Sequence, residues 1–149
     1  MKSDLVVRAW QPGDLQLLMN AGPRLSAKTL QARFWSPVPA LPATYLRRVA
    51  ERWPKRWDAV VALDGDDLVG WAEFGRYAAG DPHADIGACV VDDEQGHGVG
   101  TALLVALLER ARASGLISLH ADIDPYNMAA RNAWRSVTGS LAPTFAFAA

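Results

Sequence analysis

A glycine-rich turn between a strand and a helix places the strongest constraint on how this chain folds. Residues 95–101 read Gln-Gly-His-Gly-Val-Gly-Thr, after an apolar strand expected over 85–91 and before a long helix expected over 98–114. Glycines let the backbone come close to a ligand and leave several N–H groups pointing outward, and a helix N-terminus adds the positive end of its dipole. We expect an anion site that suits a pyrophosphate; the alternative is a tight strand-to-helix turn that binds nothing.

The spacing of these glycines excludes two common phosphate-binding motifs. A dinucleotide-binding turn needs Gly-x-Gly-x-x-Gly, but from Gly96 the next glycines are Gly98 and Gly100. A P-loop ends in Gly-Lys-Ser/Thr, whereas Gly100 is followed by Thr101 and Ala102, with no lysine. The pattern that remains is Gln-x-x-Gly-x-Gly.

Hydrophobic periodicity and turn residues predict the order of strands and helices. Strands are expected over 5–10, 59–63, 68–74, 85–91, 116–123 and 144–148, and helices over 15–20, 27–34, 43–53, 98–114 and 127–137. Asp14 and Ser26 are expected to cap the first two helices. Antiparallel strands followed by strand–helix–strand predict an α/β (α+β) fold with a mixed, mostly antiparallel sheet and helices on both faces. A length of 149 residues predicts a single domain over 1–149.

Composition and charge exclude several classes of function. The single cysteine, Cys89, rules out a disulfide framework, and the three histidines lack ligand spacing, so no metal is expected. Fifteen basic and sixteen acidic residues give a net charge of −1, which argues against a nucleic-acid partner. Residues 1–5 lack the apolar stretch of a signal peptide, and the longest apolar run, 102–108, is too short to cross a bilayer. We therefore expect a cytoplasmic protein without a membrane partner.

The motif Gln-x-x-Gly-x-Gly resembles the coenzyme A pyrophosphate loop of the GNAT superfamily of N-acetyltransferases, whose pattern is Arg or Gln, two residues, Gly, one residue, Gly or Ala. The strand at 87–91 is similar to the family's fourth strand, and 102–114, which Gly115 ends, is similar to its signature helix. Asn127 and Ala130 match the Asn-x-x-Ala that opens the next helix. The resemblance implies a GNAT fold, in which two neighbouring strands splay apart, and an enzyme that uses acetyl-CoA.

The resemblance also implies which residues hold coenzyme A. The loop would bind the pyrophosphate, the backbone of the preceding strand would bind the pantetheine arm, and Asn127 would lie near the arm or the thiol. A splayed strand leaves peptide groups unpaired, and one such N–H could stabilise an oxyanion. The implied cofactor-binding residues are Cys89, Val90, Val91, Gln95, Gly96, His97, Gly98, Val99, Gly100, Thr101 and Asn127.

A narrower resemblance concerns the catalytic base. Residues 25–37 are similar to a helix of the Pat-type protein lysine acetyltransferases. Residues 84–86 read Ala-Asp-Ile where that group has Ala-Glu-Phe or Ala-Glu-Val, the glutamate being catalytic. Asp85 is therefore the implied base, acting directly or through a water. Glu73, on the neighbouring strand and on the same face as Trp71, is the rival candidate.

These features predict transfer of an acetyl group from acetyl-CoA to a primary amine, either a protein lysine or a small molecule, by direct attack. Such an amine has a pKa of about 10.4, so a carboxylate must take its proton first. Many family members carry a tyrosine, as general acid, seven residues after the asparagine, but this chain has Trp134, which has no useful acidity. The alternative is a non-catalytic acyl-CoA-binding regulatory module. We expect a monomer or a homodimer.

Overall fold

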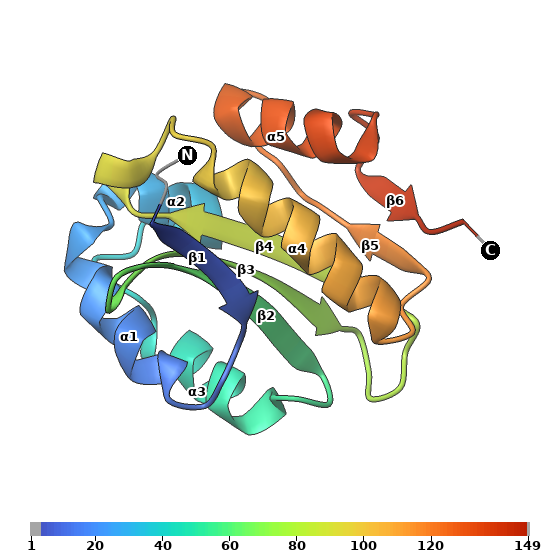
Figure 1. Cartoon of the computed structure of the whole chain (residues 1–149), viewed down its shortest axis with the longest axis horizontal. Helices are drawn as coiled ribbons and strands as arrows, with labels where there is room; N and C mark the ends of the chain where they lie inside the picture. The colour runs from blue at the N-terminus through green and yellow to red at the C-terminus, as the bar shows by residue number, and fades with distance from the viewer. Residues whose placement is uncertain (1–3, 149) are drawn as a thin grey trace.

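The centre of the fold is a six-stranded sheet in the order β1-β2-β3-β4-β5-β6 (Figure 1). A computed structural model describes residues 4–148; residues 1–3, part of the segment without a signal-peptide pattern, and residue 149 lie outside the described residues. The strands are β1 (Leu5–Ala9), β2 (Trp57–Asp64), β3 (Asp67–Arg76), β4 (His83–Val90), β5 (Ser118–His120) and β6 (Thr144–Ala146). Neighbouring strands are antiparallel except β4 and β5, so the predicted mixed sheet is confirmed.

Helices cover both faces of this sheet, as predicted. They are α1 (Asp14–Ala21), α2 (Ala27–Phe34), α3 (Ala43–Arg52), α4 (Val99–Ala113) and α5 (Met128–Thr138), with 3-10 turns η1 (Gly22–Arg24) and η2 (Asp92–Glu94). Helix α4 lies across β1 to β4 with α5 beside it, whereas α1, α2 and α3 pack on the opposite face (Figure 1). No helix in the described part of the chain is both long and apolar enough to span a membrane.

The sheet opens between β4 and β5. The two parallel strands pair over three residues each, and the last pair is Asp85 with His120. Strand β4 then continues to Val90, and no strand within residues 4–148 pairs with it on that side. The expected strand over 116–123 is too long, because the diverging chain loses the ladder hydrogen bonds to β4 beyond His120. The splayed pair implied by the family resemblance is therefore present.

Of the two predicted helix caps, Ser26 is confirmed and Asp14 is wrong. Ser26 caps α2, because its Oγ accepts the Thr29 N–H at 3.2 Å. Asp14 does not cap α1 but is the first residue of the helix. Its buried carboxylate accepts hydrogen bonds from the Arg8 guanidinium at 2.7 and 2.8 Å and from the Gln11 N–H at 2.8 Å. These bonds offset the cost of removing the charge from water, and they fasten β1 to α1.

Trp134 joins α5 to the C-terminal segment. Its indole is buried, and the Nε1–H donates to the Ala142 carbonyl oxygen at 2.8 Å. Ala142 lies two residues before β6, so this bond helps to hold β6 at the edge of the sheet. The indole N–H is therefore committed to the fold.

We expect Trp134→Phe to lower the free energy of unfolding by about 1–2 kcal/mol, because the Ala142 carbonyl loses its donor and the smaller ring leaves space. Urea unfolding measures this change. Trp35→Phe is the control: Trp35 is 59% exposed, so its free energy of unfolding should stay within about 0.5 kcal/mol of wild type. Equal stability of Trp134→Phe and the wild type would contradict this role of the indole.

Candidate functional site

The turn between β4 and α4 presents six backbone amides in a row. Gly96 and Gly98 have φ of +79° and +84°, a left-handed backbone that glycine adopts without strain. Helix α4 begins at Val99, and the Ala102 N–H donates to the Gly98 carbonyl oxygen at 3.1 Å. Within residues 4–148, nothing accepts a hydrogen bond from the amides of residues 96–101. These amides, at the positive end of a 15-residue helix, form a cradle suited to an anion.

Polar contacts hold this turn against the start of α2. The Gln95 Nε2 donates to the Val90 carbonyl oxygen at 2.9 Å and to Thr29 Oγ1 at 3.1 Å. Asp92 Oδ1 accepts the Ser26 N–H at 2.9 Å. Burial works to raise the pKa of Asp92, but hydrogen bonds from Ser26 and Thr29 outweigh it and lower the pKa. The amide cradle is therefore supported by side chains that lie outside it.

The unpaired edge of β4 offers further backbone groups beside the turn. The Val91 N–H donates to the Val69 carbonyl oxygen at 2.9 Å, so Val91 directs its amide toward β3. Backbone direction alternates along an antiparallel ladder, so Cys89 also faces β3, whereas Ala88 and Val90 face the gap between β4 and β5. The family resemblance did not indicate Ala88, and the amides of Cys89 and Val91 do not face the gap. The two-residue period of the strand is the signal that distinguishes Ala88 and Val90, which face the gap, from Cys89 and Val91, which face β3.

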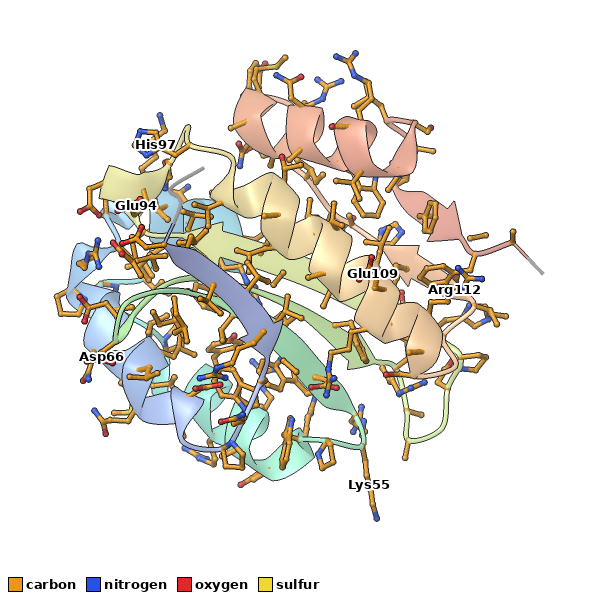
Figure 2. The ribbon with its side chains drawn as sticks, in the orientation of Figure 1. Lys55, Asp66, Glu94, His97, Glu109 and Arg112 are labelled. Carbon is orange, nitrogen blue, oxygen red and sulfur yellow. The ribbon has the colours of Figure 1, made fainter. Side chains whose placement is uncertain are left out.

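The side chains of three other predicted residues have distinct surroundings. Burial raises the pKa of the Cys89 thiol to about 12, so this thiol stays protonated and is no nucleophile. His97 is half exposed in the turn, with Nδ1 3.8 Å from Glu94 Oε2 (Figure 2). Asn127 Oδ1 accepts the Ala130 N–H at 3.1 Å and so caps α5.

Asp85 lies where β4 and β5 part. It forms the last pair with β5, and its carboxylate is exposed. The Tyr77 hydroxyl donates to Asp85 Oδ1 at 2.6 Å. Val90, at the cradle end of β4, is five residue steps along the strand from Asp85, a distance of about 17 Å. The sequence pattern does not indicate Tyr77, because no local pattern shows which residue of the loop between β3 and β4 will lie beside Asp85.

Glu73 lies in a contrasting environment at the middle of β3. Its carboxylate is 6% exposed, and four side chains donate to it. They are Arg33 of α2 at 2.6 Å, Tyr45 of α3, Trp57 of β2 at 2.5 Å and Trp71 of β3 at 2.9 Å. Burial alone would raise the pKa of Glu73, but the Arg33 charge and the donors outweigh it and lower the pKa. Glu73 is buried and paired with the Arg33 charge, whereas the Asp85 carboxylate is exposed, so we favour Asp85 over Glu73 as the candidate base.

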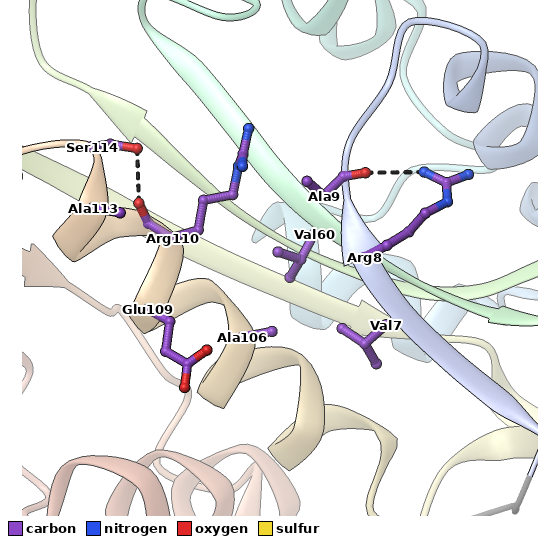
Figure 3. Close-up of a pocket in the computed structure, with 9 residues that line it drawn as sticks. All are labelled: Val7, Arg8, Ala9, Val60, Ala106, Glu109, Arg110, Ala113 and Ser114. Atoms are coloured by element: carbon purple, nitrogen blue, oxygen red, sulfur yellow. Dashed lines mark hydrogen bonds between the residues drawn. The ribbon is translucent and has the colours of Figure 1, made fainter.

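A separate cavity of about 550 Å³ lies between β1, β2 and α4 (Figure 3). Its two arginines already have partners, since Arg110 Nε is 2.7 Å from Asp58 Oδ2 and Arg8 is 2.7 Å from Asp14 Oδ2. The cavity contains no residue of the predicted site. Its lining residues are Val7, Arg8, Ala9, Val60, Ala106, Glu109, Arg110, Ala113 and Ser114.

We expect Glu73→Gln to lower the free energy of unfolding by about 3–5 kcal/mol near neutral pH, because the Arg33 charge stays buried without its partner. Chemical unfolding measures this, with Glu51→Gln, an exposed change on α3, as the control. The lowered pKa of Glu73 makes its contribution present above the unfolded pKa, about 4.3, and lost as the pH falls through the folded pKa. The free energies of unfolding of the wild type and Glu73→Gln should therefore become equal at acid pH. If Glu73→Gln unfolds like Glu51→Gln, the buried pair is not stabilising.

The described geometry agrees with comparisons to known proteins. The model of the acetyltransferase (GNAT) family matches residues 27–139, which is more than half of the chain. That span includes the amide cradle, the opening between β4 and β5, and both carboxylates considered above.

Solved structures share the fold. The GNAT domain of S. lividans PAT matches with a TM-score of 0.79 and 24% identity, over 88% of this chain and 78% of that one. The Salmonella typhimurium protein yncA, solved with its cofactor acetyl-CoA, matches with a TM-score of 0.72 and 20% identity, over 90% and 78%. Spermidine N-acetyltransferase from Vibrio cholerae, in complex with CoA and spermine, matches with a TM-score of 0.70 and 17% identity, over 91% and 80%. By its family match and by its fold, the chain belongs to the GNAT family of acetyltransferases.

Proposed function

We propose that this chain transfers an acetyl group from acetyl-CoA to a primary amine, with Asp85 as general base. The observation that carries the proposal is the arrangement of three features along β4. The amide cradle lies at one end of the strand, the free backbone edge follows, and Asp85 lies at the point where β4 and β5 part. A ligand with a pyrophosphate at one end and a thioester at the other suits this order.

The residues along this path fit acetyl-CoA. The amides of residues 96–101 would hold the pyrophosphate, and the Val90 amide and the Ala88 carbonyl would pair with the arm. His97 lies within the turn and stays a proposed neighbour of the pyrophosphate, and Asn127 stays a proposed neighbour of the arm. When bound, acetyl-CoA supplies an activated acetyl group.

The side chains then divide the chemistry. Asp85 takes the proton that a primary amine carries near neutral pH. The free amine attacks the acetyl carbon directly, which agrees with the absence of a reactive thiol at Cys89. The Ala88 amide faces the gap and donates to the acetyl oxygen as negative charge develops there. Trp134 gives its N–H to Ala142 and supplies no proton, so solvent protonates the leaving group.

The acceptor is a protein lysine or a small-molecule amine. The resemblance of residues 25–37 to Pat-type enzymes supports a lysine, and the likeness to a spermidine N-acetyltransferase solved with spermine supports a polyamine. We further propose that residues 1–149 act as one cytoplasmic domain, as a monomer or homodimer, without metal, nucleic acid or membrane.

A non-catalytic acyl-CoA-binding module is the second candidate, and it is favoured by the bond that commits Trp134 to Ala142. Incubation with acetyl-CoA and a panel of amines and lysine peptides separates the two. Turnover supports the enzyme, whereas coenzyme A binding without turnover on any member of the panel supports the module.

Asp85→Asn should lower kcat by about 10²–10⁴ near neutral pH, because the amide cannot accept the proton of the acceptor. The melting shift produced by coenzyme A should stay as in the wild type. The loss should shrink at high pH, where the amine is already free. Asp66→Asn, an exposed change on the β2–β3 turn (Figure 2), should retain full activity. Wild-type turnover by Asp85→Asn would refute the base assignment.

Coenzyme A at about a hundredfold its Kd should stabilise the wild type by roughly 2.7 kcal/mol, a melting rise of roughly 5–10 °C. Gly98→Val should abolish that rise, because its side chain enters the cradle. Gly98 has φ of +84°, so valine also strains the backbone. Gly115→Val is the matched control, since Gly115 has the same φ of +84° with nothing within 4 Å of its added Cβ. Both variants should melt lower than the wild type, and only Gly115→Val should keep the rise. A retained rise in Gly98→Val would remove the cradle from the site.

A further inference from the structure

Tyr77 occupies one oxygen of the Asp85 carboxylate and leaves the other open. Its hydroxyl donates to Asp85 Oδ1 at 2.6 Å, whereas Asp85 Oδ2 has no hydrogen-bond partner within residues 4–148. The Tyr77 side chain is 51% exposed, so this contact lies at the surface and is not enforced by burial. One oxygen is therefore held by a donor, and the other has all of its acceptor capacity available.

The backbone that carries Tyr77 is itself fixed to the rest of the fold. The Arg56 guanidinium donates to the Tyr77 carbonyl oxygen at 3.0 Å, and the Arg76 N–H donates to the Arg56 carbonyl oxygen at 2.7 Å. The Arg76 guanidinium donates to the carbonyl oxygens of Asp81 at 2.7 Å and Ser114 at 2.8 Å. These bonds hold both ends of the β3–β4 loop, so the hydroxyl approaches Asp85 from an anchored residue.

We propose that Tyr77 is the positioning residue of the catalytic base: it holds Asp85 Oδ1 so that Oδ2 faces the acceptor amine. This inference rests on the proposed function, in which Asp85 takes the proton of that amine. The phenol need not transfer a proton itself. It orients the carboxylate, because the hydrogen bond from an anchored residue fixes where Oδ1 lies.

The groups around Tyr77 and Asp85 keep the Tyr77 hydroxyl protonated, so that it can donate to the Asp85 carboxylate. The hydrogen bond to Asp85, and then burial, raise the pKa of Tyr77 to about 12, so the phenol remains a donor across the working pH range. Four charged or titratable groups face this pair. Asp81 and Asp122 act on the Tyr77 hydroxyl through their charges. His120 pairs in register with Asp85, and His83 lies on the same strand as Asp85. His120 is bonded to Asp122 at 2.9 Å and to Thr144 at 3.1 Å, and His83 to Ser118 at 2.5 Å. Tyr77 is the donor that bonds the Asp85 carboxylate directly.

Tyr77→Phe removes the hydroxyl and keeps the ring, so it tests the proposal. With the most active amine of the panel, kcat at pH 7 should fall roughly three- to tenfold, while the KM for acetyl-CoA stays unchanged. The melting shift that coenzyme A produces should also stay as in the wild type, because Tyr77 lies outside the amide cradle. The carboxyl-carbon NMR signal of Asp85, recorded at pH 7 without any substrate, should move, because the carboxylate has lost the donor at Oδ1.

Two further variants keep the result specific. Tyr126→Phe is the matched control, because Tyr126 is 93% exposed, and both kcat and the Asp85 NMR signal should stay as in the wild type. In an Asp85→Asn background, Tyr77→Phe should cause no further loss, because residues that act as a unit are not additive.

The possible failures are distinct. If Tyr77→Phe leaves kcat and the Asp85 NMR signal unchanged while Asp85→Asn is inactive, Asp85 is the base and Tyr77 does not position it. If Tyr77→Phe lowers the rate equally with and without Asp85, Tyr77 acts by another route and the proposal is overturned. If Asp85→Asn turns over like the wild type, the proposed base fails, and the positioning role fails with it.

Discussion

The buried carboxylate of Glu73 joins the sheet to α2 and α3, two of the helices that cover one of its faces. A buried charge is stable only with partners, because its removal from water is costly. Its four donors come from α2, α3, β2 and β3: Arg33, Tyr45, Trp57 and Trp71. The same contact holds Arg33 against Gly87 of β4, where an added Cβ would lie 2.9 Å from Arg33 Cζ. The buried Glu73–Arg33 pair therefore also contacts β4, the strand that borders the gap.

The candidate site is built mostly from backbone. The cradle amides and the free edge of β4 are peptide groups that secondary structure would normally pair. They lie at a turn and at a sheet opening, where solvent or a ligand can reach them. Side chains have two other tasks: Gln95 and Asp92 support the turn, and in the proposed function Asp85 would supply the chemistry. A site made of peptide groups does not depend on the net charge of the chain, which is −1.

Features with a local cause could be predicted from the sequence, and features with distant partners could not. The glycine turn and the order of elements follow from residue types a few positions apart. Glu73 was considered as a base because strand alternation places it beside Trp71, but alternation does not distinguish a carboxylate that lines a cleft from one covered by helices. Its partner Arg33 is 40 residues away. Asp14 is a suitable cap by type, yet Arg8 on the preceding strand takes its carboxylate. Strand β5 ends early because it diverges from β4. The sequence of neither strand indicates this divergence.

The Gln95 side chain also sets the polarity of the β4 edge beside the cradle. Val90 directs a carbonyl and an amide into the gap, but Gln95 Nε2 already donates to that carbonyl at 2.9 Å. The edge at this level therefore presents a donor without an acceptor, and a ligand segment lying against it is complementary only if it offers an oxygen. A glutamate at position 95 would set a carboxylate against the Val90 carbonyl oxygen, two groups that both only accept. The carbonyl at the end of β4 thus requires a side chain that ends in N–H groups, as glutamine and arginine do.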